Sequence, residues 1–200
     1  DDYHNYAILY RGNHQSRPLE RALREHNITY KVSGGTSFFD TVEVKDIVAY
    51  LRLIANPKDD PAFLRIINTP RRGIGTSTLE KLARHAARRN ISLLRAAGEI
   101  ALHNQLTKST RIKLQGLSEW LGGMVRLSAQ TDPASLTQRI IDETHYRHWL
   151  SESSKSRQVA QKRIDNINEL LTWIQRLVKT DGDASDLAQI LAQKSLLDII

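Results

Sequence analysis

Arg71–Glu80 reads RRGIGTSTLE, a Gly-apolar-Gly turn that leads directly into the start of a helix. The first amides of a helix have no intrahelical acceptor and lie at the positive end of the helix dipole. Such a turn therefore presents unpaired N–H groups to an anion, in a geometry that suits phosphate. We expect Ser77 and Glu80 to form a capping box at the start of this helix, which should continue to about Asn90.

The segment is also strongly basic. Between Arg71 and Arg95 the chain carries seven basic residues and one acidic residue, Glu80, a balance of +6 within a formal net charge of +7 for the whole chain. Leu79, Leu82, Ala83 and Ala86 should share one face of the helix, with Lys81, Arg84 and Arg88 opposite. The pattern favours phosphate binding over the alternative, a solvated basic helix after an ordinary tight turn.

A second helix should precede the turn. Asp60-Pro61 supplies an N-cap and a first-turn proline ahead of an apolar run that stops before Thr69-Pro70. Helix, short hairpin and helix together form a helix-hairpin-helix, an arrangement that binds the DNA backbone without reading bases. The Ile74 side chain should be buried and so anchor the hairpin to the core. The expected DNA-binding residues are Arg71, Arg72, Gly73, Ile74, Gly75, Thr76, Ser77, Lys81, Arg84 and Arg88.

The remaining pattern predicts a mainly α fold. We expect helices over about 40–55 (opened by an Asp40/Glu43 capping box), 107–128, 133–144 and 157–179, and a last one beginning near Ser185. The apolar stripe of 157–179 favours packing across a helical bundle over a coiled coil. At the N-terminus, apolar Tyr6–Tyr10, a helix over 16–26 and alternating Thr29–Val32 predict a small β-α-β stub from an α/β domain.

Composition limits the function. The chain has 200 residues, 40% of them hydrophobic, and no cysteine, which excludes disulfides and thiolate chemistry. Its pI of about 9.8 favours nucleic acid as partner, ahead of an anionic membrane surface. No apolar run could span a membrane, and we expect a cytoplasmic protein. Because it starts without methionine and without a signal segment, the chain is expected to be a piece of a longer protein.

No catalytic constellation stands out. The chain lacks a Gly-x-x-x-x-Gly-Lys-Ser/Thr loop and an acidic strand end for magnesium, so we expect no ATP hydrolysis by this chain alone. His145 and His148 lack a third metal ligand, and no metal site is predicted. The three tryptophans should pack in the core. Tyr10-Arg11, at the predicted strand end, would suit a nucleotide, although the pattern alone favours a buried tyrosine beside a surface arginine.

Several motifs, in order, resemble the UvrD/Rep/PcrA group of superfamily 1A DNA helicases, most closely its Rep branch. Residues 6–17, YAILYRGNHQSR, look like motif IV of that family. GGTSFF at 34–39, EVKDI at 43–47, AYLR at 49–52 and NTPRRGIG at 68–75 continue the match. The resemblance is dense over residues 6–82, and beyond about residue 95 it rests on helical character and length.

The resemblance implies that residues 1–35 begin the RecA-like subdomain 2A and that 36–200 form the helical insertion 2B. Tyr10 would stack on the adenine of ATP and Arg11 would reach its γ-phosphate in the full-length enzyme, which uses ATP and Mg²⁺. The hairpin would hold duplex DNA, and residues 33–40 would be the hinge of 2B. The family unwinds DNA 3′ to 5′ in replication and repair.

This chain is thus expected to be a duplex-contacting, activity-regulating module with no bound cofactor of its own, in contact with subdomains 1A, 1B and 2A. The alternative is an interaction module that docks a replication protein through the surface of 107–128 or of 157–179.

Overall fold

The computed structural model describes residues 3–12, 15–26, 28–33, 37–181, 187–188 and 191. Within these residues the chain is built from helices and turns, which confirms the mainly α fold. The elements are η1 (Tyr3–Asn5), α1 (Ser16–Glu25), η3 (Phe38–Asp40), α2 (Val42–Ala55), α3 (Asp60–Ile66), α4 (Thr76–Arg89), α5 (Leu93–Ala97), α6 (Ile100–His103), α7 (Lys108–Ser128), α8 (Pro133–Glu143), α9 (Tyr146–Ser153) and α10 (Arg157–Asp181). The last predicted helix, from near Ser185, lies mostly outside the described residues.

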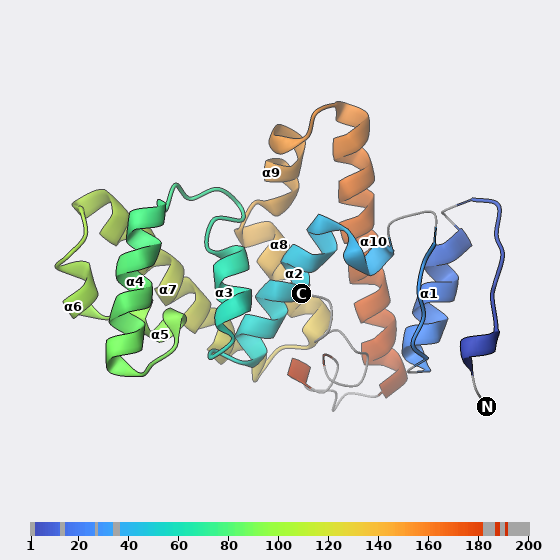
Figure 1. Cartoon of the computed structure of the whole chain (residues 1–200), viewed down its shortest axis with the longest axis horizontal. Helices are drawn as coiled ribbons and strands as arrows, with labels where there is room; N and C mark the ends of the chain where they lie inside the picture. Colours follow the sequence, from blue (N-terminus) through green and yellow to red (C-terminus); the bar gives the residue numbers. More distant parts are fainter. Residues whose placement is uncertain are drawn as a thin grey trace.

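Helix α2 occupies the centre of the molecule, where it contacts α3, α7, α8 and α10 (Figure 1). Residues 46–51 are all buried, as expected for a helix that is apolar on nearly every side. Asp46 is the polar member of that run. Its carboxylate accepts hydrogen bonds from Arg65 Nε at 2.9 Å and from the Tyr146 hydroxyl at 2.7 Å. Burial raises the pKa of Asp46, and these two hydrogen bonds partly oppose that rise.

Helix α10 packs across the bundle against α2, α8 and α9. Of the predicted apolar stripe, Ala160, Ile167, Leu171 and Ile174 are buried, which confirms core packing. The side of the helix that is buried is wider than predicted, because Leu170, Trp173 and Leu177 are buried as well. Trp173 is fully enclosed, and its indole N–H donates to Glu25 of α1 at 3.1 Å.

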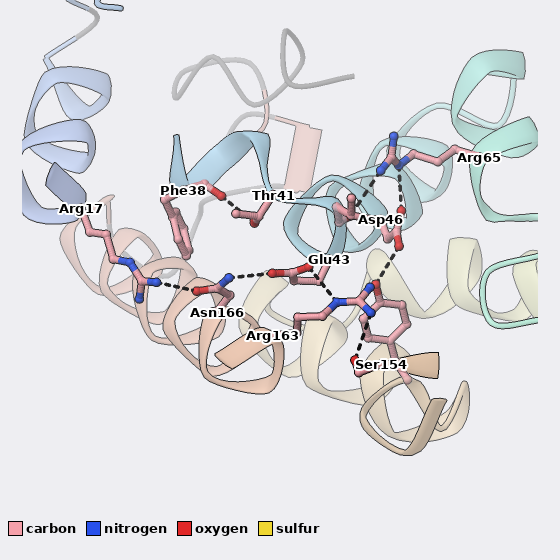
Figure 2. Close-up of polar contacts among 11 residues, drawn as sticks. Arg17, Phe38, Thr41, Glu43, Asp46, Arg65, Ser154, Arg163 and Asn166 are labelled. Carbon is pink, nitrogen blue, oxygen red and sulfur yellow. Dashed lines mark hydrogen bonds and ion pairs between the residues drawn. The ribbon is translucent and has the colours of Figure 1, made fainter. Parts of the chain in front are cut away.

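A set of paired charged and polar side chains joins α1, α2 and α10, and we call it the polar network: Arg17, Glu43, Arg163, Asn166 and Glu169. Figure 2 shows Arg17, Glu43, Arg163 and Asn166 of this network. Buried Glu43 accepts hydrogen bonds from Asn166 Nδ2 at 2.6 Å and from Arg163 Nε at 3.2 Å. Arg17 donates to Asn166 Oδ1 at 2.8 Å and forms an ion pair with Glu169. Each cation of the network therefore has a carboxylate partner.

Both predicted capping boxes are wrong. Thr41 precedes α2 and Gly75 precedes α4, and neither helix has a side-chain cap. Glu43 turns to Asn166 and Arg163 because a buried carboxylate needs charged and polar partners more than the N-cap amide needs an acceptor. Ser77 lies inside α4, two positions after the N-cap residue Gly75, so it cannot cap the helix. The predicted N-cap of α3 is off by one residue: Asp59 caps the helix by accepting from the Ala62 amide, and Asp60, inside α3, accepts from the Leu93 amide instead. Helix α8, for which no cap was predicted, is capped by Asp132.

The predicted β-α-β stub is wrong in its strands and right in its helix, α1. Within the described residues neither 6–10 nor 28–33 is a strand. A strand requires a neighbouring backbone to form its ladder, and these two segments do not form one with each other. Tyr6, Ile8 and Leu9 are exposed rather than buried. Residues 34–36 of the predicted hinge lie outside the described residues.

Candidate nucleic-acid interface

The side chain of Asn68 bridges the hairpin between α3 and α4. Its Nδ2 donates to the Ile74 carbonyl at 2.7 Å, and its Oδ1 accepts from the Ile74 amide at 3.0 Å. Ile74 is buried, as predicted. Gly73 has a φ of +68°, a left-handed conformation that favours glycine. These contacts fix the turn so that its outer side, with Gly73 and Gly75, faces solvent.

Arg72 points inward. Its Nη1 donates to the carbonyl of Ile66 at 2.7 Å and to that of Pro70 at 3.2 Å, and its Nη2 donates to the Tyr50 hydroxyl at 2.7 Å. The Tyr50 hydroxyl in turn donates to the Thr69 carbonyl. Burial raises the pKa of Tyr50, against the effect of the Arg72 charge. The last carbonyls of a helix have no intrahelical donor, and Arg72 supplies one to them.

The start of α4 is open. Thr76 and Ser77 are exposed, and within the described residues their amides have no backbone acceptor. A Cβ added at Gly75 would meet nothing within 4 Å, so an anion could approach the backbone there. Arg71 is exposed and has no hydrogen-bond or ion-pair partner in the part of the chain that the structure describes. Unpaired amides beside an unpaired guanidinium form an anion-binding arrangement.

The basic residues of α4 differ in their surroundings. Leu82 and Ala86 are buried on the opposite face, as predicted, whereas Ala83 is exposed. Lys81 Nζ donates to the Gln105 carbonyl at 2.9 Å, and Arg84 makes a long contact of 3.4 Å to the carbonyl of Glu80. Arg88 is exposed, and no partner for it occurs among the described residues.

Tyr10 and Arg11, the residues predicted to contact ATP, lie in the N-terminal segment, at the other end of the longest axis from α4 (Figure 1). Tyr10 is half-buried and Arg11 is exposed. The Arg11 amide donates to Gln15 Oε1 at 3.0 Å, which starts the turn into α1. The fold therefore keeps these two residues apart from the hairpin.

The histidines and tryptophans considered from the sequence do not form a further binding site among the described residues. His148 pairs with Glu152 at 3.2 Å, and His145 precedes α9 in a left-handed conformation. In the described ranges, no three histidine or carboxylate side chains gather as metal ligands would. Nor does any helix in those ranges have the length and apolar character to cross a membrane. Trp120 and Trp149 are partly buried against the core.

Two residues of the hairpin region were not singled out by sequence reasoning. Asn68 bridges the turn and Tyr50 receives Arg72, yet both are common residue types with no spacing signal. Asn68 did stand within the NTPRRGIG match and Tyr50 within the AYLR match, so the resemblance pointed to their segments but not to their contacts.

Residues 1–199 of the chain match the protein family described as the UvrD-like helicase C-terminal domain. The chain is 42% identical over 200 residues to the ATP-dependent DNA helicase Rep of Salmonella typhimurium, with 99% of this chain and 30% of that protein covered. It is 41% identical to Rep of Escherichia coli, with the same coverage. It is 36% identical over 193 residues to the ATP-dependent DNA helicase PcrA of Bacillus subtilis, covering 96% of this chain and 26% of that protein. The chain thus spans about 30% of the length of these Rep relatives and belongs to the UvrD-like helicase C-terminal domain family.

Proposed function

We propose that this chain is the duplex-contacting, accessory part of an ATP-dependent 3′ to 5′ DNA helicase. Residues 36–200 form its helical 2B insertion, and residues 1–35 belong to subdomain 2A. In the whole enzyme this part contacts subdomains 1A and 1B and the rest of 2A. The named activity of the Rep and PcrA relatives supports the parent function. In that enzyme Tyr10 and Arg11 contact ATP, which is bound with Mg²⁺.

The observation that carries the duplex contact is the open start of α4. Unpaired amides at Thr76 and Ser77, left-handed Gly73 and exposed Arg71 lie together, and Arg88 extends the positive charge along the helix. Backbone amides and exposed arginines bind phosphate oxygens and carry no base information. The binding is therefore independent of sequence. Arg72 serves the hairpin rather than the phosphate, since four protein oxygens lie within hydrogen-bond distance of its guanidinium.

Titration of a fluorescently labelled DNA duplex with the 200-residue chain, at several salt concentrations, tests this function. About three to five phosphate contacts give a slope of log affinity against log salt of roughly −3 to −4.5. The double variant Arg71→Ala/Arg88→Ala should weaken binding about tenfold or more at low salt and reduce the slope by about 1.8. Absence of binding at low salt would overturn the proposal.

A matched control removes two charges elsewhere. Lys58, in the turn before α3, and Lys162, on α10, are both exposed and have no ion-pair partner among the described residues. The double variant Lys58→Ala/Lys162→Ala should leave most of the affinity in place. Equal losses in the two double variants would indicate general electrostatic attraction rather than a hairpin site.

The rival function is docking of a replication protein on α7 or α10. Exposed Ile112 of α7 and Val159 of α10 offer apolar surface for such a partner. Capture of a partner by this surface would survive the Arg71→Ala/Arg88→Ala change, whereas the duplex contact would not.

A further inference from the structure

Lys113 of α7 lies beside the hairpin, although it is distant in sequence. A Cβ built on Gly73 would lie 3.4 Å from Lys113 Nζ, so the ammonium group is next to the left-handed turn. The Lys113 side chain is exposed, and it has no hydrogen-bond or ion-pair partner among the described residues. A second unpaired cation therefore joins Arg71 at the outer side of the turn.

The core fixes α7 in this position. Trp120 lies two turns after Lys113 on the same face of α7, and its ring packs edge-on against Tyr50 with 5.9 Å between ring centroids. Tyr50 accepts a hydrogen bond from Arg72 of the hairpin. The indole N–H of Trp120 also donates to Glu143 of α8 at 2.7 Å. The position of Lys113 beside Gly73 thus follows from the packing of α7 against α2 and α8.

The surface of α7 next to Lys113 is open. Gly116 follows one turn later, it is exposed, and a Cβ there would meet nothing within 4 Å. A bulky ligand such as a nucleic-acid strand can therefore lie against this part of α7 while it contacts the hairpin. Lysine suits such a contact, because its ammonium acts as a flexible point charge toward a phosphate.

We propose that Lys113 binds a phosphate of the DNA duplex, so that the interface is built from two elements, the hairpin and α7. This inference rests on the proposed duplex contact and extends it to a helix that the sequence motifs do not include. Arg71, two residues before Gly73, and Lys113, whose ammonium lies beside Gly73, then supply cations from two elements to the same backbone.

The test compares Lys113→Ala and Lys113→Arg with wild type in the same duplex titration. Lys113→Ala should weaken binding about three- to tenfold at low salt, by a similar factor for unrelated duplex sequences, and reduce the salt slope by about 0.9. Lys113→Arg keeps the charge and should stay within about twofold of wild type. Lys162→Ala is the matched control, and circular dichroism confirms that each variant is folded.

The outcomes separate the two proposals. If wild type binds with a salt slope and Arg71→Ala/Arg88→Ala weakens it, while Lys113→Ala behaves as Lys162→Ala does, then the role of Lys113 is wrong and the duplex contact stands. If wild type shows no salt-dependent binding at all, the duplex contact and the role of Lys113 are both wrong.

Discussion

The polar network and the hairpin region both concentrate arginines, but the arginines have different partners. In the polar network, Arg17 and Arg163 each contact a carboxylate between packed helices. In the hairpin region, Arg71 and Arg88 project into solvent without a partner among the described residues. The difference separates two uses of the same side chain: a paired arginine stabilises the fold, and an unpaired one remains available to an anionic ligand.

Arg72 shows that the division does not follow position in the sequence. It is adjacent to Arg71 in the most basic segment of the chain, yet its guanidinium donates to the backbone of its own hairpin and to Tyr50. A charge count from the sequence treats these neighbours alike. The structure assigns them opposite roles, and the comparison can be tested residue by residue.

The largest expected effect belongs to the polar network. Glu43→Ala removes from Arg163 and Asn166 the carboxylate acceptor that they share in a largely buried site, and the free energy of unfolding should fall by about 2–3 kcal/mol. Urea unfolding followed by circular dichroism measures it. Glu119→Ala, at an exposed position of α7, is the control and should change stability by less than about 0.5 kcal/mol. The duplex affinity of folded Glu43→Ala should match that of wild type. A loss of affinity without a loss of stability would contradict the separation between fold-stabilising and DNA-binding arginines.

The next effect is a difference in stability between variants of two adjacent residues, Arg71 and Arg72. Arg72→Ala removes hydrogen bonds to the carbonyls at the end of α3 and to Tyr50, and should lower the free energy of unfolding by about 1–2 kcal/mol. Arg71→Ala should change stability by no more than about 0.5 kcal/mol and should weaken duplex binding. The two variants are compared by urea unfolding and by titration. Similar stabilities for both variants would contradict the inward role of Arg72.

The smallest effect concerns Glu99, the carboxylate that pairs with His85 and Arg89 of α4. The hydrogen bond from His85 at 2.7 Å, aided by Arg89, lowers the pKa of Glu99 below its usual range. A lowered pKa in the folded state stabilises the fold above about pH 4.5, and this stabilisation is lost as the pH falls through the folded pKa. Glu99→Gln should therefore have a lower Tm than wild type at pH 6, and the two should converge toward pH 3. A difference that grows as the pH falls would have the wrong sign.

Most of the fold could be predicted from the sequence, because the longer helices carry apolar stripes that repeat over several turns. Helices α2, α7, α8 and α10 carry apolar stripes over several turns, and their predicted bounds lie within about two residues of the observed ones. Sequence reasoning missed α5, α6 and α9, which have four to eight residues each. Stripes that short cannot be distinguished from loops by periodicity.

Two of the errors share one physical cause, which is that distant contacts decided the local structure. Glu43 fits a capping box by spacing, but Asn166 and Arg163 reach it from α10. Tyr6–Tyr10 has a strand-like composition, yet a strand depends on a neighbouring backbone. The same limit applies to the candidate site. Its segment followed from Gly73, Ile74 and Gly75, whereas the inward turn of Arg72 and the nearness of Lys113 follow from packing.

The bridging of the turn by Asn68 affects how much conformational entropy is lost when a ligand binds. Because its amide bonds both backbone groups of Ile74, the turn is held in one conformation before any ligand arrives. A preformed turn loses little conformational entropy when it is occupied, so more of the contact energy remains as affinity. Encounter then resembles the docking of a rigid body, with an association rate governed by long-range charge attraction rather than by loop rearrangement.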